Sequence, residues 1–261
     1  MSAPDVLAII PARFASTRLP GKPLLRETGR FLVQHVVERV RLATSVKRCL
    51  VATDDIRIAE AVRSFGGDAV MTRSDHPTGT DRLAEVVSAT RDGPGSRDSD
   101  VILNVQGDEP EIEPGYLDAL VERMAAADAE TPMATLACPF PADADPADPV
   151  AVKVVLDSAG RALYFSRAMI PHRRGSGAPR SPGLHLHVGV YAYRRAFLLE
   201  YSGWPSGMLE GIEQLEQLRV LERGRRIAVA VVPRAAPGID TPADYARFVE
   251  RWRGAAESGA Q

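Results

Sequence analysis

The first half of the chain alternates short apolar runs with longer segments whose apolar residues recur at helical spacing. Residues 6–10 form an unbroken apolar run, which is typical of a strand buried on both faces of a parallel sheet. Apolar residues in 32–42 fall on one helical stripe. The same alternation predicts the remaining elements of this half: strands at 49–52, 69–71 and 101–105, and helices at 56–65, at 81–90 and from Pro114 onwards. Strand–helix–strand repeats predict right-handed βαβ units, and therefore a parallel sheet with helices on both faces.

The second half is richer in strands. Apolar and β-branched runs predict strands at 133–137, 152–156, 162–165, 186–193 and 227–232, with a hairpin loop at 157–160. Residues 173–183 combine Arg, Gly, Ser and Pro, which predicts a mobile loop. An amphipathic helix is predicted over 212–221 and a last helix over 245–252, with fraying after Arg253. The predicted fold class is α/β, a Rossmann-like mixed, mostly parallel sheet with an appended smaller antiparallel portion.

Composition and charge narrow the class of protein. The 261 residues are 45% hydrophobic and 25% charged, which is ordinary for a soluble globular protein. The net charge of −2 argues against a general nucleic-acid binder, and no apolar run approaches the ~20 residues needed to span a bilayer. The two cysteines, Cys49 and Cys138, form neither a disulfide framework nor a zinc-ligand pattern, and no signal peptide is visible. We therefore expect a cytoplasmic enzyme or binding protein.

The segment PARFASTRLPGKPL, residues 11–24, follows the first predicted strand. Ligands of open α/β sheets bind beyond the carboxyl ends of the strands, so a site is expected here. Arg13, Arg18 and Lys22 place three cations close together, interleaved with hydroxyls and Gly21, a combination that suits a polyphosphate. The spacing is neither GxxxxGK[ST] nor GxGxxG. A solvated basic loop is the alternative that the charge count by itself leaves open.

This loop strongly resembles the phosphate-binding signature of the 3-deoxy-D-manno-octulosonate cytidylyltransferases (CMP-Kdo synthetases). Eight further segments are similar to blocks of that family in the same order: VATDD (51–55), MTRSDHPTGTDRLAEVV (71–87), LNVQGDEP (103–110), AVKVVLD (151–157), ALYFSRAMIP (162–171), GVYAYR (189–194), IEQLEQLRVLERG (212–224) and IDTPADY (239–245). The resemblance implies a fold of the nucleotide-diphospho-sugar transferase type. It also implies one domain over 1–253, with a nucleotide-binding part over about 1–130 and a sugar-binding and dimerisation part over about 131–240. The pattern after Arg253 predicts a disordered tail at 254–261.

The resemblance implies that the first loop and the segment around residue 80 hold the nucleotide. The implied nucleotide-binding residues are Pro11, Ala12, Arg13, Ser16, Arg18, Lys22, Thr78, Gly79, Thr80, Arg82 and Gln106. The implied catalytic residues are Lys22, Arg18 and Asp108. Residue pattern by itself fits Thr78 or Thr80 equally well as the N-cap of the helix that follows. We interpret His76 as structural.

A magnesium site is predicted where the strand of LNVQGDEP ends. Asp108 can supply a hard oxygen ligand, and Mg²⁺ is commonly held by one or two carboxylates together with substrate phosphates. The resemblance supplies Asp240 as the second carboxylate. Each of these residues has a structural alternative, because Asp108 fits a turn and Asp240 fits a helix cap before Pro242. Glu109 and Glu111 are expected to be solvated.

The acidic sugar is expected in the second half. Arg167 follows an apolar strand and can pair with a carboxylate through two parallel hydrogen bonds. His187 and Tyr191 are four apart in a predicted strand and therefore share a face. The pattern places Glu216 and Gln217 on the polar flank of the 212–221 helix. The resemblance implies the full sugar-binding set: Gln106, Arg167, His187, Tyr191, Glu216 and Gln217.

The reaction implied by the resemblance is transfer of CMP from CTP to the anomeric hydroxyl of 3-deoxy-D-manno-octulosonate (Kdo), with release of pyrophosphate and with Mg²⁺ as cofactor. The implied protein is a cytoplasmic homodimer, paired through the later strands, that supplies lipopolysaccharide or capsule synthesis. Two alternatives stay open. The first is another acidic acceptor (an amino-Kdo, a nonulosonate or a phosphonate), because the 173–183 loop and the run AAPGIDTP are shorter than the family pattern. The second is an inactive nucleotide-binding regulator, against which the presence of both carboxylates argues.

Overall fold

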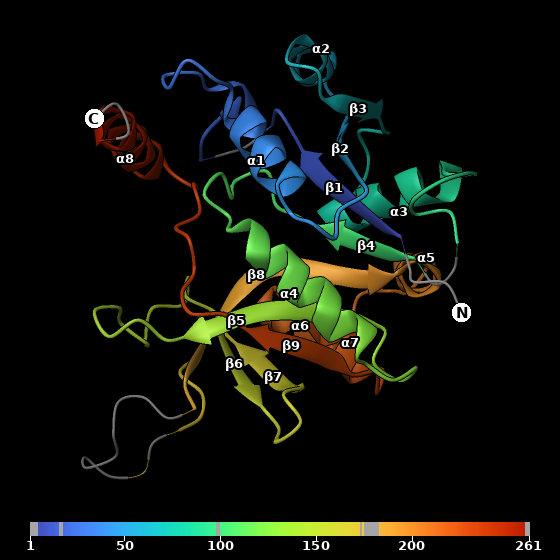
Figure 1. Cartoon of the computed structure of the whole chain (residues 1–261). Coiled ribbons are helices and arrows are strands. Elements are labelled where there is room, and N and C mark those ends of the chain that lie inside the picture. The colour runs from blue at the N-terminus through green and yellow to red at the C-terminus, as the bar shows by residue number, and fades with distance from the viewer. Residues whose placement is uncertain (1–4, 16–17, 98–99, 173, 175–182, 259–261) are drawn as a thin grey trace.

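The computed structural model describes residues 5–15, 18–97, 100–172, 174 and 183–258 (Figure 1). Within them a nine-stranded sheet has the order β3-β2-β1-β4-β8-β5-β9, and β6 and β7 form a hairpin that joins it at β8. The strands are β1 Val6–Ala12, β2 Arg48–Thr53, β3 Asp68–Met71, β4 Val101–Asn104, β5 Met133–Pro139, β6 Lys153–Leu156, β7 Ala162–Ser166, β8 His185–Arg194 and β9 Ile227–Val231.

The pairing directions confirm the predicted fold class. β1 pairs in parallel with β2 and β4, β2 with β3, and β5 with β9. β8 runs antiparallel to both of its neighbours in the main sheet, β4 and β5, and the β6–β7 hairpin is antiparallel throughout. From β1 the chain passes to β2 on one side and later to β4 on the other. The carboxyl ends of β1 and β4 therefore form the switch point of the sheet, where ligands of such folds bind.

Helices cover both faces of the sheet, because side chains alternate between faces along each buried strand. Even-numbered residues of β1, such as Ala8 and Ile10, belong to a core shared with α1, α2 and α4, whereas Leu7 and Ile9 belong to a core shared with α3, α5 and α7. The helices are α1 Leu32–Arg41, α2 Ile56–Ser64, α3 Gly79–Ala89, α4 Pro114–Ala125, α5 Arg195–Ser202, α6 Met208–Glu213, α7 Leu218–Glu222 and α8 Pro242–Ser258, with a 3₁₀ turn at Lys22–Leu24. Every predicted strand is confirmed.

The predicted helix over 212–221 is wrong. The structure has two short helices, α6 and α7, separated at Gln214, whose φ of 53° is left-handed. The Arg167 guanidinium explains the break: its Nε donates to the carbonyl of Glu213 (2.7 Å) and its Nη2 to that of Gln214 (3.3 Å). A continuing helix would use these carbonyls for amides four residues further along. Glu216 therefore lies in a turn and does not occupy the polar flank of a helix.

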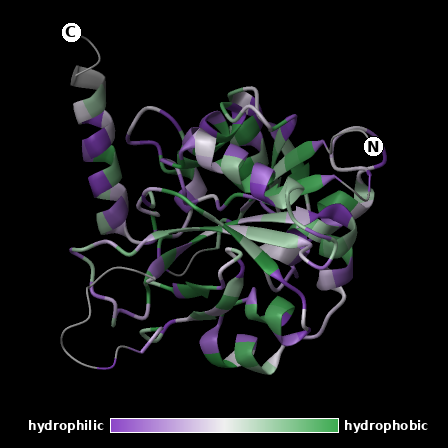
Figure 2. Ribbon diagram, turned by 60° about the horizontal axis from the view of Figure 1, so that its bottom comes forward, coloured by the Kyte–Doolittle hydropathy of each residue, from purple (hydrophilic) through white to green (hydrophobic). Residues whose placement is uncertain are grey.

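The last helix is longer than predicted. α8 continues to Ser258, so the expected fraying after Arg253 is wrong for 254–258, and 259–261 lie outside the described residues. Tyr245, Phe248 and Val249 pack on Leu32 at the start of α1. Figure 2 shows α8 at the edge of the molecule, banded with hydrophilic residues. Across the described part of the chain, no helix combines the length and apolar character that crossing a membrane requires. The predicted mobile loop at 173–183 falls outside the described residues, except at 174 and 183.

Candidate active site

The loop that leaves β1 is held in place by its own side chains. Gly21 has a left-handed φ of 68°, and the Phe14 ring lies against it, so that an added Cβ would come within 3.2 Å of a ring carbon. A glycine is therefore required for the turn itself. This turn starts the 3₁₀ helix at Lys22. Further back in the loop, Arg13 Nη2 donates to the carbonyl of His76 (2.7 Å) and so ties the loop to the segment before α3.

Lys22 lies between the two carboxylates predicted to hold a metal. Its Nζ is 2.8 Å from Asp108 Oδ2 and 3.5 Å from Asp240 Oδ1, and it donates to the carbonyl of Ile239 at 2.7 Å. Arg18 Nη2 is 3.3 Å from Asp240 Oδ1. Lys22 is 14% exposed and Arg18 62%. The tertiary structure thus unites four predicted residues that are up to 222 positions apart in the sequence.

The donor set fits a divalent cation. Asp108 and Asp240 turn oxygens toward one cationic centre, which is occupied by the Lys22 ammonium, and hard oxygens are the ligands that Mg²⁺ prefers. In the described part of the chain, three or more His, Cys, Asp or Glu residues nowhere gather into a metal-binding group. Two carboxylates without further protein ligands match a Mg²⁺ ion whose remaining ligands come from phosphates and water.

Glu109 is half-buried, whereas we expected it to be solvated. One of its carboxylate oxygens is buried without a hydrogen-bond partner, and burial, followed by the nearby charges of Asp108 and Asp240, raises the pKa of Glu109 to about 8. The chain at Gly238 runs beside this carboxylate, since a Cβ added to Gly238 would lie 3.6 Å from Glu109 Oε1. Glu111 instead forms an ion pair with Arg251 of α8.

A cavity of about 480 Å³ opens above this cluster at the carboxyl ends of β1 and β4. Its walls come from the β1 loop, the start of α3, the end of β4 and the segment before α8. The predicted residues that line it are Pro11, Ala12, Arg13, Arg18, Lys22, Thr78, Gly79, Gln106, Asp108, Glu216 and Asp240. Predicted residue Ser16 lies outside the described residues. We call this cavity the nucleotide pocket.

At the start of α3, the structure separates three residues that the resemblance groups together. Thr78 is the N-cap: its hydroxyl accepts from the Asp81 amide (3.2 Å) and donates to the Asp81 carboxylate (2.8 Å). The Thr80 hydroxyl donates to Glu216 Oε2. Arg82 is fully buried, and its guanidinium donates to Asp54 Oδ2 (3.0 Å) and to the Thr72 hydroxyl. Arg82 therefore lies outside the nucleotide pocket and braces α3 against the end of β2.

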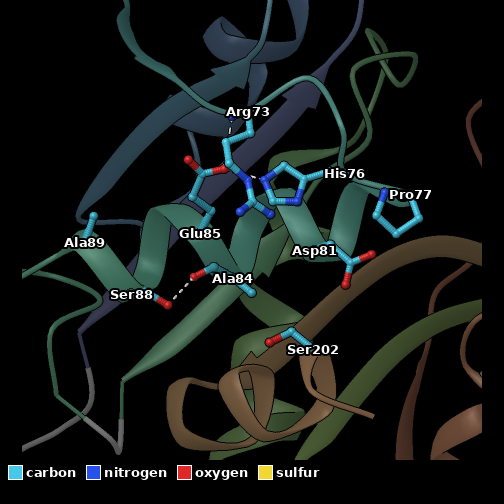
Figure 3. Close-up of a pocket in the computed structure, with 9 residues that line it drawn as sticks. All are labelled: Arg73, His76, Pro77, Asp81, Ala84, Glu85, Ser88, Ala89 and Ser202. Atoms are coloured by element: carbon cyan, nitrogen blue, oxygen red, sulfur yellow. Dashed lines mark hydrogen bonds and ion pairs between the residues drawn. The ribbon is translucent and has the colours of Figure 1, made fainter. Parts of the chain in front are cut away.

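A second cavity, of about 700 Å³, lies behind this segment, between α3 and the end of α5 (Figure 3). His76 is buried at its edge, and its Nε2 contacts the carboxylate of Glu85, which also accepts from the amide of Arg73. Burial would raise the pKa of Glu85, but the hydrogen bonds from His76 and Arg73 outweigh it and lower that pKa. His76 thus anchors the segment whose carbonyl receives Arg13.

A third cavity, of about 250 Å³, adjoins the nucleotide pocket. We call it the acceptor pocket. The residues that line it are Gly79, Thr80, Asn104, Gln106, Gly189, Tyr191, Tyr193, Gln214, Leu215, Glu216 and Gln217. Gly79, Gln106 and Glu216 line both pockets and therefore mark their junction. The Tyr191 hydroxyl donates to Gln217 Oε1 (3.3 Å), and Gln217 Nε2 is buried without a partner.

The structure does not bring His187 and Arg167 into the lining of the acceptor pocket. His187 Nε2 lies 2.9 Å from the Thr135 hydroxyl, and burial lowers the pKa of His187 to about 3. Its ring lies behind that of Tyr191, with the centroids 5.6 Å apart. The Arg167 guanidinium is occupied by the carbonyls that break the predicted helix and by that of Pro149 (2.9 Å). In this structure both residues support the pocket from behind.

Sequence reasoning missed five lining residues of the acceptor pocket: Asn104, Gly189, Tyr193, Gln214 and Leu215. Alternation carried a usable signal for one of them. Tyr193 is two positions from Tyr191 in β8 and therefore shares its face. Asn104 is the last residue of β4 and lies within the segment LNVQGDEP (103–110), two positions before the predicted residue Gln106, so a polar residue there indicated the same rim.

Comparison with known proteins agrees with this geometry. A family model described as cytidylyltransferase matches residues 7–227. The 3-deoxy-manno-octulosonate cytidylyltransferase of Syntrophotalea carbinolica is 48% identical over 256 residues, which cover 96% of this chain and 99% of that protein. The 3-deoxy-manno-octulosonate cytidylyltransferase of Serratia proteamaculans is 48% identical over 254 residues, which cover 95% of this chain and 99% of that protein.

Solved structures give the same result. A CMP:2-keto-3-deoxy-manno-octonic acid synthetase in complex with CTP superposes with a TM-score of 0.87 at 42% identity, covering 96% of this chain and 99% of the other. A 4-diphosphocytidyl-2C-methyl-D-erythritol synthase, with a TM-score of 0.61 at 15% identity, shares the fold. The two adjoining pockets, the paired carboxylates and these similarities over nearly the whole chain lead to one conclusion: the chain belongs to the cytidylyltransferases, in the 3-deoxy-manno-octulosonate cytidylyltransferase family.

Proposed function

We propose that this protein transfers CMP from CTP to the anomeric hydroxyl of Kdo, giving CMP-Kdo and pyrophosphate. The observation that carries the proposal is the junction of the two pockets. The nucleotide pocket contains the cations Arg13, Arg18 and Lys22, and it opens directly onto the acceptor pocket at Gln106 and Glu216. Such an arrangement allows a triphosphate and a hydroxylated acceptor to meet. The names of the relatives, and the CTP in the related structure, support the choice of substrates.

The phosphates are bound by fixed positive charge. Arg13 and Arg18 offer planar guanidinium groups and Lys22 offers an ammonium, all at the rim where β1 ends. Gly107 allows the backbone to pass close to β1, since an added Cβ would lie 3.1 Å from the carbonyl of Pro11. These groups neutralise the charge that develops on the departing pyrophosphate. Phosphoryl transfer depends mainly on such positioning and neutralisation, so no covalent protein nucleophile is required.

The acceptor is oriented by neutral and acidic side chains. Gln106, Tyr191, Glu216 and Gln217 line its pocket and can exchange hydrogen bonds with sugar hydroxyls, so that the anomeric hydroxyl faces the α-phosphate in line with the leaving pyrophosphate. Asp108 and Asp240 would hold Mg²⁺. When bound, the ion supplies charge neutralisation at the phosphates and lowers the pKa of a hydroxyl bound to it. Arg167 and His187 stay in the proposed sugar-binding set as supports of this pocket.

We also infer a cytoplasmic homodimer paired through the later strands. An exposed apolar side chain on β7, Leu163, supports the dimer, since 60% of it is open to solvent while its neighbour Phe165 is buried. Two free, buried thiols, Cys49 and Cys138, are consistent with a reducing compartment. The product would serve lipopolysaccharide or capsule synthesis.

Pyrophosphate release tests the proposed function. The purified protein is incubated with CTP, Mg²⁺ and Kdo, and in parallel reactions with an amino-Kdo, a nonulosonate or a phosphonate as the acceptor. We expect release with Kdo, loss of release when UTP replaces CTP, and a product with the mass of CMP-Kdo. Release with a different acidic acceptor but not with Kdo would contradict the proposed acceptor, and no release with any acceptor would contradict transferase activity.

A further inference from the structure

Thr80 stands apart from the other residues at the start of α3. It is the second residue of the helix, it is only 4% exposed, and its hydroxyl donates to Glu216 Oε2 at 2.8 Å, across 136 positions of sequence. The hydroxyl of Thr78, two residues earlier, is used differently, since it caps α3 through Asp81. Two threonines of one short segment thus face two different parts of the site.

Glu216 depends on contacts from outside its own segment. It lies in the turn between α6 and α7, so no helix or strand of its own fixes the direction of its side chain. Its carbonyl accepts from the Tyr201 hydroxyl (3.0 Å), which holds the backbone. Among the described residues, Thr80 is the side chain that donates a hydrogen bond to the Glu216 carboxylate.

The surroundings of this contact make it strong. The Tyr193 hydroxyl lies against the side chains of Thr80 and Asn104, and all three residues line the acceptor pocket. The contact is part-buried, and a hydrogen bond that a carboxylate accepts in such a place is worth more than an average one. Replacing only the donor leaves the carboxylate without its partner, and the carboxylate then turns away or recruits water.

We propose that Thr80 is a positioning residue for the acceptor and not a reader of the nucleotide. It holds the Glu216 carboxylate at the junction of the two pockets, so that Glu216 meets the sugar in one orientation. The proposal rests on the proposed function, because it names the acceptor pocket as the site of the sugar. It assigns different substrates to Thr78 and Thr80, although the two residues are separated only by Gly79.

Kinetics of three full-length variants test this assignment. Thr80→Val removes the hydroxyl at nearly constant shape, Thr80→Ser keeps it, and Thr78→Val is the matched control two positions away. For Thr80→Val we expect the KM for Kdo to rise about tenfold or more, with the KM for CTP within about twofold of wild type. Thr80→Ser should restore the KM for Kdo. Thr78→Val should leave the KM for Kdo unchanged and raise the KM for CTP.

Thr80→Val should also be less than additive with Glu216→Gln, because both changes remove the same contact. A rise in the KM for CTP with an unchanged KM for Kdo would overturn the proposal, and so would additive effects of the two substitutions.

A second measurement needs no turnover. Amide hydrogen exchange of the substrate-free protein should speed up in Thr80→Val within residues 214–218, and Thr78→Val should not produce this change. Unchanged exchange at 214–218 in Thr80→Val would contradict the proposal. A wild-type protein that releases no pyrophosphate from CTP and Kdo would contradict the proposed function instead, and the exchange comparison would still decide whether Thr80 holds the Glu216 turn.

Discussion

Lys22 brings together the charges of the nucleotide pocket. Its ammonium lies 2.8 Å from Asp108 and 3.5 Å from Asp240, while Arg18 also reaches Asp240. Two carboxylates that face one position would repel each other without a cation, and the lysine keeps them in place. Any change at this cluster therefore alters both the charge that receives the phosphates and the oxygens that would hold a metal.

Removal of the Asp108 charge is the direct test at the residue scale. Asp108→Asn keeps the size of the side chain but weakens it as a ligand of Mg²⁺, so turnover should fall by a factor on the order of 10³ while the melting temperature stays within a few degrees. Steady-state rates and thermal unfolding measure the two effects. Glu111→Gln is the matched control, because Glu111 pairs with Arg251 away from the nucleotide pocket. Near-normal turnover in Asp108→Asn would remove this residue from the catalytic set.

For Arg82 we expect a loss of stability and not a loss of substrate binding. Its fully buried guanidinium pairs with Asp54, and loss of one partner leaves a poorly solvated charge, so Arg82→Met should destabilise the protein by about 3–5 kcal/mol. Urea unfolding measures this loss. In the variant that remains folded at low temperature, calorimetry should give an affinity for CTP close to that of wild type. A variant of normal stability that has lost CTP binding would restore Arg82 to the nucleotide set.

At the scale of elements, α8 is attached through aromatic packing on α1. His35 of α1 lies between the rings of Phe248 and Trp252, with centroids 5.1 and 4.4 Å away, and its Nε2 is 2.7 Å from the Thr28 hydroxyl. Burial, partly opposed by Glu38, lowers the pKa of His35 to about 4. The folded protein therefore favours the neutral ring.

This shift predicts a pH dependence of stability. Above the unfolded pKa of about 6.5 both states carry neutral His35, so it adds no pH dependence there. As the pH falls from about 6.5 to about 4, the unfolded state binds a proton that the folded state does not. The free energy of unfolding should therefore decrease by roughly 1.4 kcal/mol per pH unit because of this group. His35→Phe should remove that part of the slope, as seen in the difference between the two urea-unfolding series. Parallel curves for the two proteins would contradict the assignment.

The turn between α6 and α7 shows how one element depends on another. The periodicity of 212–221 is genuinely helical, but the Arg167 guanidinium takes the carbonyls of Glu213 and Gln214. The Glu213 carboxylate in turn accepts from the Ser166 hydroxyl (2.6 Å) and the Arg167 amide (2.9 Å). These contacts from β7 divide the helix and turn Glu216 and Gln217 into the acceptor pocket.

At the scale of the whole molecule, the site depends on the order of strands. Because β1 lies between β2 and β4, the loop after β1 meets the end of β4, and β8 places Tyr191 and Tyr193 beside it. The later strands also supply the surface that we infer for dimerisation.

The dimer is tested by sedimentation. Leu163→Asp adds a charge to an exposed apolar position on β7 and should shift the protein from dimer to monomer at micromolar concentration. Leu42→Asp is the control, since Leu42 is equally exposed (64%) but follows α1, in the first half of the chain. Dissociation by the control and not by Leu163→Asp would contradict pairing through the later strands.

The sequence by itself determined the strands and most of the helices, the parallel pairing of the first half and the cluster of cations after β1, because hydrophobic periodicity and turn residues act over a few positions. The resemblance to the cytidylyltransferase family added Asp240 and the sugar-binding residues to the predicted site. Only the tertiary structure decided that Arg82 is a buried brace, that Glu109 is half-buried beside Asp108 with one carboxylate oxygen unpartnered, and that the 212–221 helix is broken. Each of these outcomes depends on a partner that is distant in sequence, such as Asp54 or Arg167. Local sequence patterns depend on residues a few positions apart and therefore do not predict such partners.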